Sequence, residues 1–368
     1  MQARYTLYGA PASHFAGKLR AYLNYKGVDY VEREPSALQL ARLGRRLGFR
    51  AVPILELQPG EFIVDTPLIM DELEKRHPAR PVHAQTPVQV FASMLLENWF
   101  DDSWVGISMM TRWLHEENWN TLLRAELARS LFPSLPGFIG EPLAAKTLKR
   151  YLTDALPYFG VTPEQSDLLS RWALRTLDRL DEHFEHHSYL FGGRPTTADY
   201  GLLGTLVGHL NRDPWPRREW LGPRPTLQKW VDFAGKGGAA TGDLLEGDAV
   251  PATVAPIFAG LFAEFPTYIR AAVSRLQAKI EKEGLQPGDP IGRILPKVRY
   301  PLLGERFERN PLTYTIWRMQ RIQEAFAKMS AEDQEAVRRW CAAMGDASLP
   351  AMDLGPKLQR KGLTAALA

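Results

Sequence analysis

Residues 3–20 read Ala3-Arg-Tyr-Thr-Leu-Tyr-Gly-Ala-Pro-Ala-Ser-His-Phe-Ala-Gly-Lys-Leu-Arg20. Their sequence pattern changes from alternating to helical within a few residues. Residues 3–8 alternate and contain strand formers, and a Gly-Ala-Pro turn follows them. From Phe15 onward, apolar side chains recur at three- and four-residue spacing, which is typical of an amphipathic helix. Gly27 ends this pattern. The stretch therefore predicts a strand, a turn and a helix over Phe15–Tyr25.

The residues that follow extend this beginning into a small α/β unit. A second strand after the helix completes a strand–helix–strand segment of the size of one βαβ crossover. Further on, a Pro-Gly turn separates two apolar runs, which predicts a hairpin. The predicted elements are a strand at Val28–Glu32, a short basic helix at Leu38–Leu47, and strands at Ala51–Leu57 and Glu61–Val64. A last helix runs through Lys75, with Thr66 as its N-cap, Pro67 at its first position and His77-Pro78 at its end.

The rest of the chain reads as mostly helical. Strand signals nearly vanish from Pro87 to Val231, and the glycine-rich stretch Gly235–Gly247 indicates a boundary. Beyond it we expect one or two helices in Pro251–Lys282, a small hairpin in Gly284–Arg309, and helices at Pro311–Met329 and Ala331–Met344. The tail after Asp346 is rich in proline and glycine, and we expect it to be loosely ordered.

The composition is that of an ordinary globular protein, with 368 residues, 45% hydrophobic and 24% charged. The net charge of +3 does not by itself indicate nucleic acid, and we interpret the 17 basic and 11 acidic residues of 266–368 as a solvated face. Cys341 is the one cysteine, so an intrachain disulfide and a cysteine-based zinc site are excluded. No run approaches a membrane span, and Met1–Gly9 lacks a signal-peptide core. We therefore expect a cytoplasmic protein without membrane or nucleic-acid contacts.

Three segments of the first 80 residues carry features that could contact a ligand. Ser13 opens a helix, where a hydroxyl lies beside unpaired N–H groups and the positive end of the helix dipole, a setting that favours a thiolate. Val52-Pro53 is a proline in an apolar run, as found at an edge strand or at a cis bond that turns the backbone outward. Asp65-Thr66 opens another helix, whose N–H groups could hold a carboxylate. Each segment alone is compatible with a plain cap or an edge proline.

Together these segments resemble the thioredoxin-like N-terminal domain of cytosolic glutathione S-transferases. Ser13-x-Phe-x-x-Lys-Leu-Arg20 is similar to the serine motif of the tau-like, serine-type classes. Val52-Pro53 is similar to the family's cis-proline segment, and Asp65-Thr66 is similar to its Glu-Ser or Asp-Ser pair. The signature of the family's all-helical C-terminal domain is similar to Tyr189-Leu-Phe-Gly-Gly-Arg-Pro-Thr-Thr-Ala-Asp-Tyr200. In physical terms this segment is a capping box between Thr196 and Asp199. The resemblance covers residues 3–233.

The resemblance implies two domains, and the rest of the chain adds an extension and a tail. It predicts an α/β thioredoxin-like glutathione-binding domain over residues 1–80 and the all-α transferase C-terminal domain over 87–235. Residues 248–345 form an additional, mostly helical extension of unassigned role, and 346–368 the loosely ordered tail. The family is commonly dimeric, which implies a homodimer.

The resemblance also implies a reaction. Glutathione would be the co-substrate, with no metal, and its thiol would be activated by the Ser13 hydroxyl for attack on a small apolar electrophile. It implies glutathione-binding roles for Phe15, Val52, Pro53, Asp65 and Thr66. The electrophile pocket would be lined by Tyr8, His14, Trp104, Met109 and Trp113.

Several alternatives stay open on the sequence alone. Tyr8 is the second candidate for the activating hydroxyl. His14 replaces the family's proline, and together with the extension this departure favours a non-catalytic binding or interaction module. In a third interpretation, the basic helices after residue 266 contact an acidic partner. Position 13 holds no cysteine, so chemistry that needs a protein thiol there is excluded, and the His183, His186 and His187 cluster is interpreted as a solvated helix end.

Overall fold

The computed structural model describes residues 5–48, 50–362 and 364–368. The chain forms two compact units, and each unit combines segments that are distant in sequence. The first unit comprises residues 1–82, 105–156 and 202–239, and the second comprises 83–104, 157–201 and 240–368. Consecutive stretches of the chain therefore do not fold as separate blocks, because single helices contribute residues to both units.

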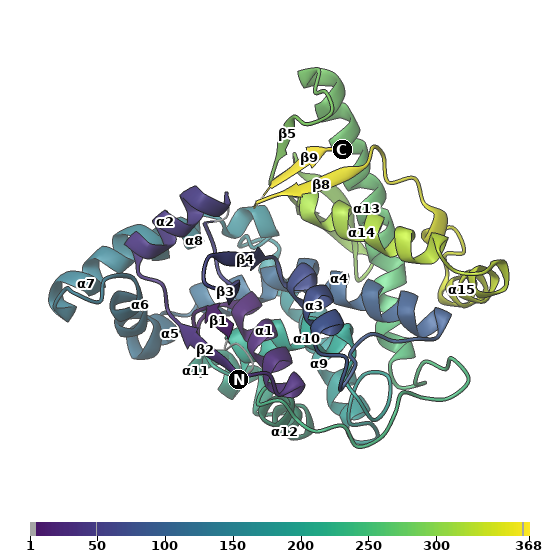
Figure 1. The fold of residues 1–368 in the computed structure, drawn as a ribbon, viewed down its shortest axis with the longest axis horizontal. Helices are drawn as coiled ribbons and strands as arrows, with labels where there is room; N and C mark the ends of the chain where they lie inside the picture. Colours follow the sequence, from purple (N-terminus) through teal and green to yellow (C-terminus); the bar gives the residue numbers. More distant parts are fainter. Residues whose placement is uncertain (1–4, 49, 363) are drawn as a thin grey trace. The chain divides into compact units, whose positions relative to one another are not determined.

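A four-stranded mixed sheet forms the centre of the first unit, with the strand order β2-β1-β3-β4 (Figure 1). Strand β1 pairs parallel with β2 and antiparallel with β3, and β3 forms an antiparallel hairpin with β4. In this register Tyr8, Ile54 and Val64 lie opposite one another at one edge of the sheet. The strands are β1 (Tyr5–Tyr8), β2 (Tyr30–Arg33), β3 (Ile54–Gln58) and β4 (Glu61–Val64).

Helices α1 (His14–Lys26) and α3 (Thr66–Arg76) pack against each other in this unit. The Tyr22 hydroxyl of α1 donates to Glu74 of α3 over 2.8 Å, and Lys26 forms an ion pair with the same carboxylate at 2.9 Å. Gly27 ends α1 in the left-handed conformation, as predicted. Helix α2 (Ala37–Leu47) has no buried residue and begins at a complete capping box of Ser36 and Gln39.

The remaining elements of the first unit are helical. They include the second half of α4 (Pro87–Trp113), whose first half belongs to the second unit. They are α5 (Glu116–Asn118), η1 (Trp119–Leu123), α6 (Arg124–Leu131), α7 (Gly137–Ala144), η2 (Ala145–Lys149), α8 (Arg150–Asp154), η4 (Leu206–Leu210), α11 (Pro214–Pro216), η5 (Arg217–Leu221) and α12 (Pro225–Ala234), while η3 (Leu156–Phe159) and α10 (Thr197–Thr205) cross between the units.

The second unit joins the first half of α4 to the C-terminal third of the chain. Buried carboxylates of α4 meet buried arginines from beyond residue 300: Asp102 pairs with Arg309 at 3.1 Å, and Glu97 with Arg318 at 2.6 Å. The elements are α9 (Ser166–Phe184), α13 (Ala255–Glu283), β5 (Pro290–Gly292), β6 (Val298–Leu302), β7 (Glu305–Arg309), α14 (Thr313–Ala327), α15 (Ala331–Met344), η6 (Leu349–Ala351), β8 (Leu358–Lys361) and β9 (Thr364–Leu367).

The structure settles two expectations about the region beyond residue 250. Helix α13 is a single helix that continues through Pro266, so the pattern in Pro251–Lys282 is one helix. The hairpin expected in Gly284–Arg309 is present as β6 and β7. Among the described residues, no helix is long and apolar enough to span a bilayer.

The prediction of a loosely ordered tail is wrong for the described residues. Strands β8 and β9 form a hairpin that joins β5 in a three-stranded sheet and lies beside α14 (Figure 1). Gln320 of α14 accepts a hydrogen bond from the backbone N–H of Leu358 over 2.9 Å, and Ala365 and Ala366 are fully buried. Proline and glycine suggested a loop, but the short apolar run after them finds a partner strand about 70 residues earlier in the chain.

The buried pair of Asp102 and Arg309 gives a prediction about stability. Substitution Arg309→Met leaves Asp102 buried without its countercharge, and we expect it to lower the free energy of unfolding by about 3–5 kcal/mol. The double variant Asp102→Asn with Arg309→Met removes both charges and should lose clearly less than the sum of the two single variants. Urea unfolding of the four proteins measures this, and additive losses would contradict it.

Candidate functional site

The three segments singled out in the sequence leave the same edge of the four-stranded sheet. Tyr8 ends β1, Ile54 begins β3 and Val64 ends β4, and these three residues are paired side by side. The loop to Ser13 follows Tyr8, Pro53 immediately precedes Ile54, and Asp65 immediately follows Val64. Strand pairing therefore gathers residues from three distant parts of the sequence at one place.

Ser13 is the N-cap of α1, as predicted. Its backbone is extended, and its hydroxyl oxygen accepts a hydrogen bond from the Ala16 N–H over 3.2 Å. The side chain is half-buried. A hydroxyl can accept and donate at once, so this cap leaves its hydrogen available to a ligand at the positive end of the helix.

A buried arginine holds the loop that carries Ser13. Arg112 donates to the carbonyl oxygen of Ala12 over 2.5 Å and to that of Gly208 over 2.6 Å. It forms a two-point ion pair with the fully buried Asp213, at 2.6 and 2.9 Å. Sequence reasoning missed Arg112, because its partners lie far away along the chain and no local motif marks them.

The peptide bond between Val52 and Pro53 is cis. Pro53 is buried and lies just before β3, which begins at Ile54. Strand β3 is paired on both sides, so the alternative of an ordinary edge-strand proline is wrong. Val52 is half-buried and precedes the paired residues of the strand.

Helix α3 begins one residue earlier than predicted. Its N-cap is Asp65 and not Thr66, and Thr66 is the first helical residue. Asp65 has φ 80° and ψ 120°, a conformation that is costly for a residue with a side chain and that recurs at functional sites. Thr66 Oγ1 is buried and makes no hydrogen bond within the described residues. A buried hydroxyl without a partner is costly, which indicates a place for a ligand group.

His14 is a packing residue in this structure. It is buried, and its Nδ1 lies 3.2 Å from Ser108 Oγ and 3.5 Å from Thr205 Oγ1. A Cβ at Gly204 would come within 2.7 Å of the ring, so glycine is needed where α10 approaches. Burial, aided by the charges of Lys18 and Arg112, lowers the pKa of His14 to about 3. The ring is therefore neutral at physiological pH.

The Tyr8 hydroxyl is engaged elsewhere. It donates to Glu56 of β3 over 3.1 Å, and its ring lies 6.3 Å from that of Phe62 on β4. Burial and this neighbouring carboxylate raise the pKa of Tyr8. A phenol hydrogen-bonded to a carboxylate is poorly suited to stabilise a thiolate, which favours Ser13 over Tyr8.

The other residues expected at the electrophile pocket are mainly core residues. Trp104 is fully buried in the second unit and packs with Trp99, Phe100 and Trp172. In the first unit Met109 and Trp113 are 8% and 7% exposed. Phe15, which was expected to bind glutathione, is half-buried with its ring 4.6 Å from that of His14. Helical spacing alone could not separate core from pocket.

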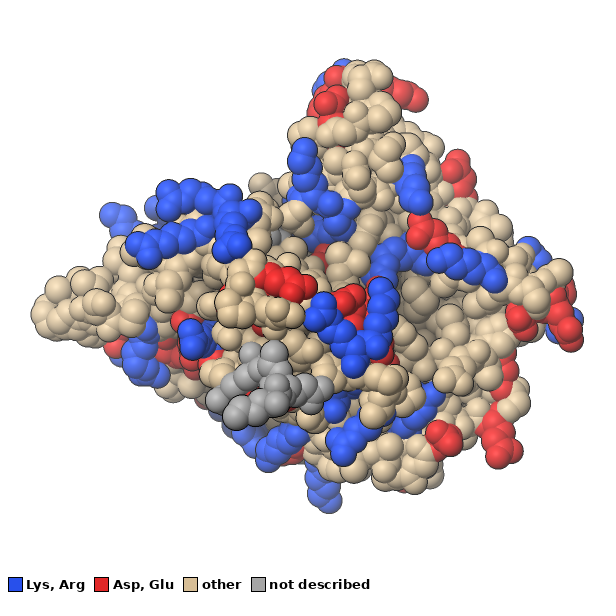
Figure 2. All heavy atoms as spheres, viewed as in Figure 1, with Lys and Arg blue, Asp and Glu red and all other residues tan. Residues whose placement is uncertain are grey.

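A hollow of about 320 Å³ lies beside the loop that leads to Ser13. It is lined by Pro11, Glu34, Glu126, Arg129, Ser130 and Pro133. Its lining includes charged side chains of both signs, unlike the apolar pocket expected from the sequence. Figure 2 shows, on the same unit, the basic side chains of α2 gathered on the surface. This positive surface favours anionic ligands.

The capping interaction expected at Thr196 is present. Asp199 accepts hydrogen bonds from the Thr196 N–H over 2.7 Å and from the Leu190 N–H over 2.8 Å. The prediction of a solvated helix end is wrong for His183, which is buried with Nδ1 2.7 Å from Thr253 Oγ1 and Nε2 3.1 Å from the Tyr189 carbonyl. Within the described ranges, no group of three or more His, Cys, Asp or Glu residues could hold a metal ion.

Two family models match the chain at the positions of these features. Residues 7–81 match the glutathione S-transferase N-terminal domain, and residues 173–233 match the glutathione S-transferase C-terminal domain. Together they support a protein of the glutathione S-transferase family. The fold has the thioredoxin-like N-terminal and helical C-terminal domains of that family, with a further, mostly helical C-terminal region. No curated protein matches the chain.

Solved structures that match the chain include three bacterial proteins. A GST-like protein from Pseudomonas syringae is 17% identical, with 85% of this chain and 97% of that chain covered and a TM-score of 0.43. A glutathione S-transferase from Methylobacterium radiotolerans in complex with glutathione sulfonate is 20% identical, with coverage of 66% and 99% and a TM-score of 0.38. The beta-etherase LigF from Sphingobium sp. strain SYK-6 is 18% identical, with coverage of 62% and 94% and a TM-score of 0.43.

The lowered pKa of His14 predicts a pH dependence of stability. Between about pH 6.5 and pH 3 the unfolded chain binds a proton at this position that the folded protein excludes, so stability falls as the pH falls. Substitution His14→Asn should reduce the slope of unfolding free energy against pH in this window by up to about 1.4 kcal/mol per pH unit. Equal slopes in wild type and His14→Asn would contradict the assignment.

Proposed function

We propose that this protein is a glutathione transferase that binds glutathione at the sheet edge defined by Ser13, Val52-Pro53 and Asp65-Thr66. The observation that carries the proposal is the convergence of these segments, since Tyr8, Ile54 and Val64 are paired side by side. Two helix N-termini, at α1 and α3, meet the same edge. Their N–H groups and dipoles favour an anionic ligand such as a peptide with a carboxylate and a thiolate.

Each segment has a role in this proposal. The Ser13 hydroxyl donates a hydrogen bond to the glutathione sulfur and stabilises its thiolate. Val52 pairs with the backbone of the cysteinyl residue, with Pro53 shaping the turn and Phe15 beside it. The N-terminus of α3, with Asp65 and Thr66, holds the γ-glutamyl group, and the unpartnered Thr66 hydroxyl gives the ligand carboxylate a donor.

The reacting thiol comes from the ligand in this account. Cys341, the one cysteine of the chain, is fully buried, and burial raises the pKa of its thiol to about 12. Such a thiol is neither accessible nor ionised at neutral pH. The glutathione thiolate attacks the electrophile, a carbon–sulfur bond forms, and the leaving group departs with the electron pair of the broken bond.

The second substrate lies, in this proposal, in the hollow beside Pro11. Charged side chains of α6, Arg129 among them, and of Glu34, which follows β2, line this hollow. Its chemistry favours an electrophile with polar substituents over the wholly apolar compound expected from the sequence. A homodimer and a cytoplasmic location stay predictions that rest on the resemblance.

Substitution Ser13→Ala tests the role of the hydroxyl. A hydrogen bond to a charged group contributes about 1.5–3 kcal/mol, so its loss should raise the pKa of the bound thiol by about 1–2 units. The ultraviolet absorbance of the bound thiolate, followed against pH, measures this shift. The matched control is Ser330→Ala, which removes another serine N-cap, at α15 in the second unit, and should leave the titration unchanged. An unaltered curve in Ser13→Ala would remove Ser13 from the role.

Substitution Thr66→Val tests the carboxylate site with an almost isosteric side chain. Because the hydroxyl is buried without a partner, its removal should leave the protein as stable as the wild type or more stable. Glutathione loses one charge-assisted hydrogen bond, and we expect its dissociation constant to rise about tenfold or more. Calorimetry and thermal unfolding measure the two effects. Unchanged affinity would show that Thr66 does not touch the ligand.

A further inference from the structure

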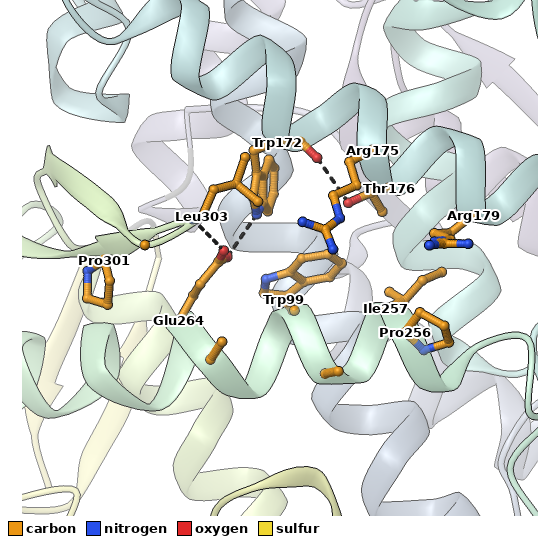
Figure 3. Close-up of a pocket in the computed structure, with 14 residues that line it drawn as sticks. Trp99, Trp172, Arg175, Thr176, Arg179, Pro256, Ile257, Glu264, Pro301 and Leu303 are labelled. Atoms are coloured by element: carbon orange, nitrogen blue, oxygen red, sulfur yellow. Dashed lines mark hydrogen bonds between the residues drawn. The ribbon is translucent and has the colours of Figure 1, made fainter.

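The second unit contains a cleft of about 420 Å³ between α9, α13 and the hairpin of β6 and β7 (Figure 3). Its residues on α9 are spaced by three and four, from Trp172 to Arg179, so they share one face of that helix. The indole of Trp99, from α4, also lines it. The volume lies within the range of small-molecule sites. Every lining residue belongs to the second unit, whereas the proposed glutathione site belongs to the first.

Small residues on α13 create the space. Ala259, Gly260 and Ala263 line the cleft on the side of this helix. A Cβ built at Gly260 would meet no atom within 4 Å. Glycine inside a helix lowers its stability, and here no close packing requires one. The glycine therefore keeps open a volume that a larger side chain would fill.

A buried carboxylate lies at one end of the cleft. Glu264 is 5% exposed, and its oxygens accept hydrogen bonds from the Trp172 indole over 2.8 Å and from the Leu303 N–H over 3.0 Å (Figure 3). A carboxylate has about four acceptor positions, so two contacts leave it able to accept from a ligand. Burial raises the pKa of Glu264 to about 7, although its two donors and Arg175 act in the opposite direction.

An unpaired cation lines the same cleft. Within the part of the chain that the structure describes, Arg175 has no hydrogen-bond or ion-pair partner, and its side chain extends over the cleft toward Trp99 (Figure 3). Other arginines on this helix are paired: Arg171 with Asp167 and Glu305, and Arg179 with Glu182. Arg175 is thus available to an anion, between two indoles that suit a flat apolar body.

We propose that this cleft binds a small aromatic carboxylate that carries a ring hydroxyl. The ligand carboxylate pairs with the Arg175 guanidinium, the ring lies against Trp99 and Trp172 over Gly260, and the hydroxyl donates to Glu264. The opposite charges of Arg175 and Glu264 fix the orientation, because a ligand carboxylate next to Glu264 would be repelled. The proposal stands independently of the glutathione site, since it shares no residue with it.

The test is a calorimetric titration of the full-length protein with 4-hydroxycinnamate. We expect binding at micromolar to low-millimolar concentration. Cinnamate, which lacks the hydroxyl, and 4-hydroxycinnamyl alcohol, which lacks the carboxylate, should each bind more weakly. Saturating glutathione should not compete, whereas competition would show that the compound occupies the other site and would overturn the proposal.

Two variants locate the binding. Gly260→Leu fills the cleft and should abolish binding while the melting temperature stays the same or rises, because leucine favours a helix over glycine. Arg175→Met keeps the apolar stem and should weaken binding about 10- to 100-fold. The matched control Arg171→Met, one turn earlier on the same helix and outside the cleft, should bind like the wild type. Absence of binding to the wild type, or equal binding by all variants, would overturn the proposal.

Discussion

The buried guanidinium of Arg112 fixes the geometry on which the proposed site depends. It ties the carbonyl oxygen of Ala12, one residue before Ser13, to the Gly208 carbonyl oxygen and to Asp213. An unpaired buried charge costs several kcal/mol, so Arg112 and Asp213 hold each other in place and with them the loop between β1 and α1. The same charge helps to keep His14 neutral. The serine is thus held by helical residues of the first unit as well as by its own helix.

Much of the first unit could be predicted because its signals are local. Alternation at residues 5–8, the glycine that ends α1, the hairpin of β3 and β4, and Ser13 as a cap each depend on neighbours in sequence. Their convergence at one edge followed from resemblance, and the strand register gives it a physical basis. The start of α3 was predicted one residue too late. Asp65 has a positive φ, and its neighbours in the sequence do not indicate that conformation.

Features that depend on distant partners could not be predicted. Arg112 meets Asp213, and the α4 carboxylates Glu97 and Asp102 meet Arg318 and Arg309. His14 was expected to lie where it could contact the ligand, but it is buried. Its ring fits there because Gly204 has no side chain. The C-terminal region is part of the folded core of the second unit, since it pairs with the buried charges of α4, and its tail completes a sheet. The cleft along α13 exists only because this region is present.

The most direct test of the central claim is the proton release that accompanies glutathione binding. Calorimetric titration at pH 7 in two buffers of different ionisation enthalpy measures it. If the bound thiol has a pKa near 7, the account predicts release of about half a proton with reduced glutathione and none with S-methylglutathione, which has no thiol hydrogen. Binding of both ligands without proton release, or no binding of either, would contradict thiolate stabilisation at Ser13.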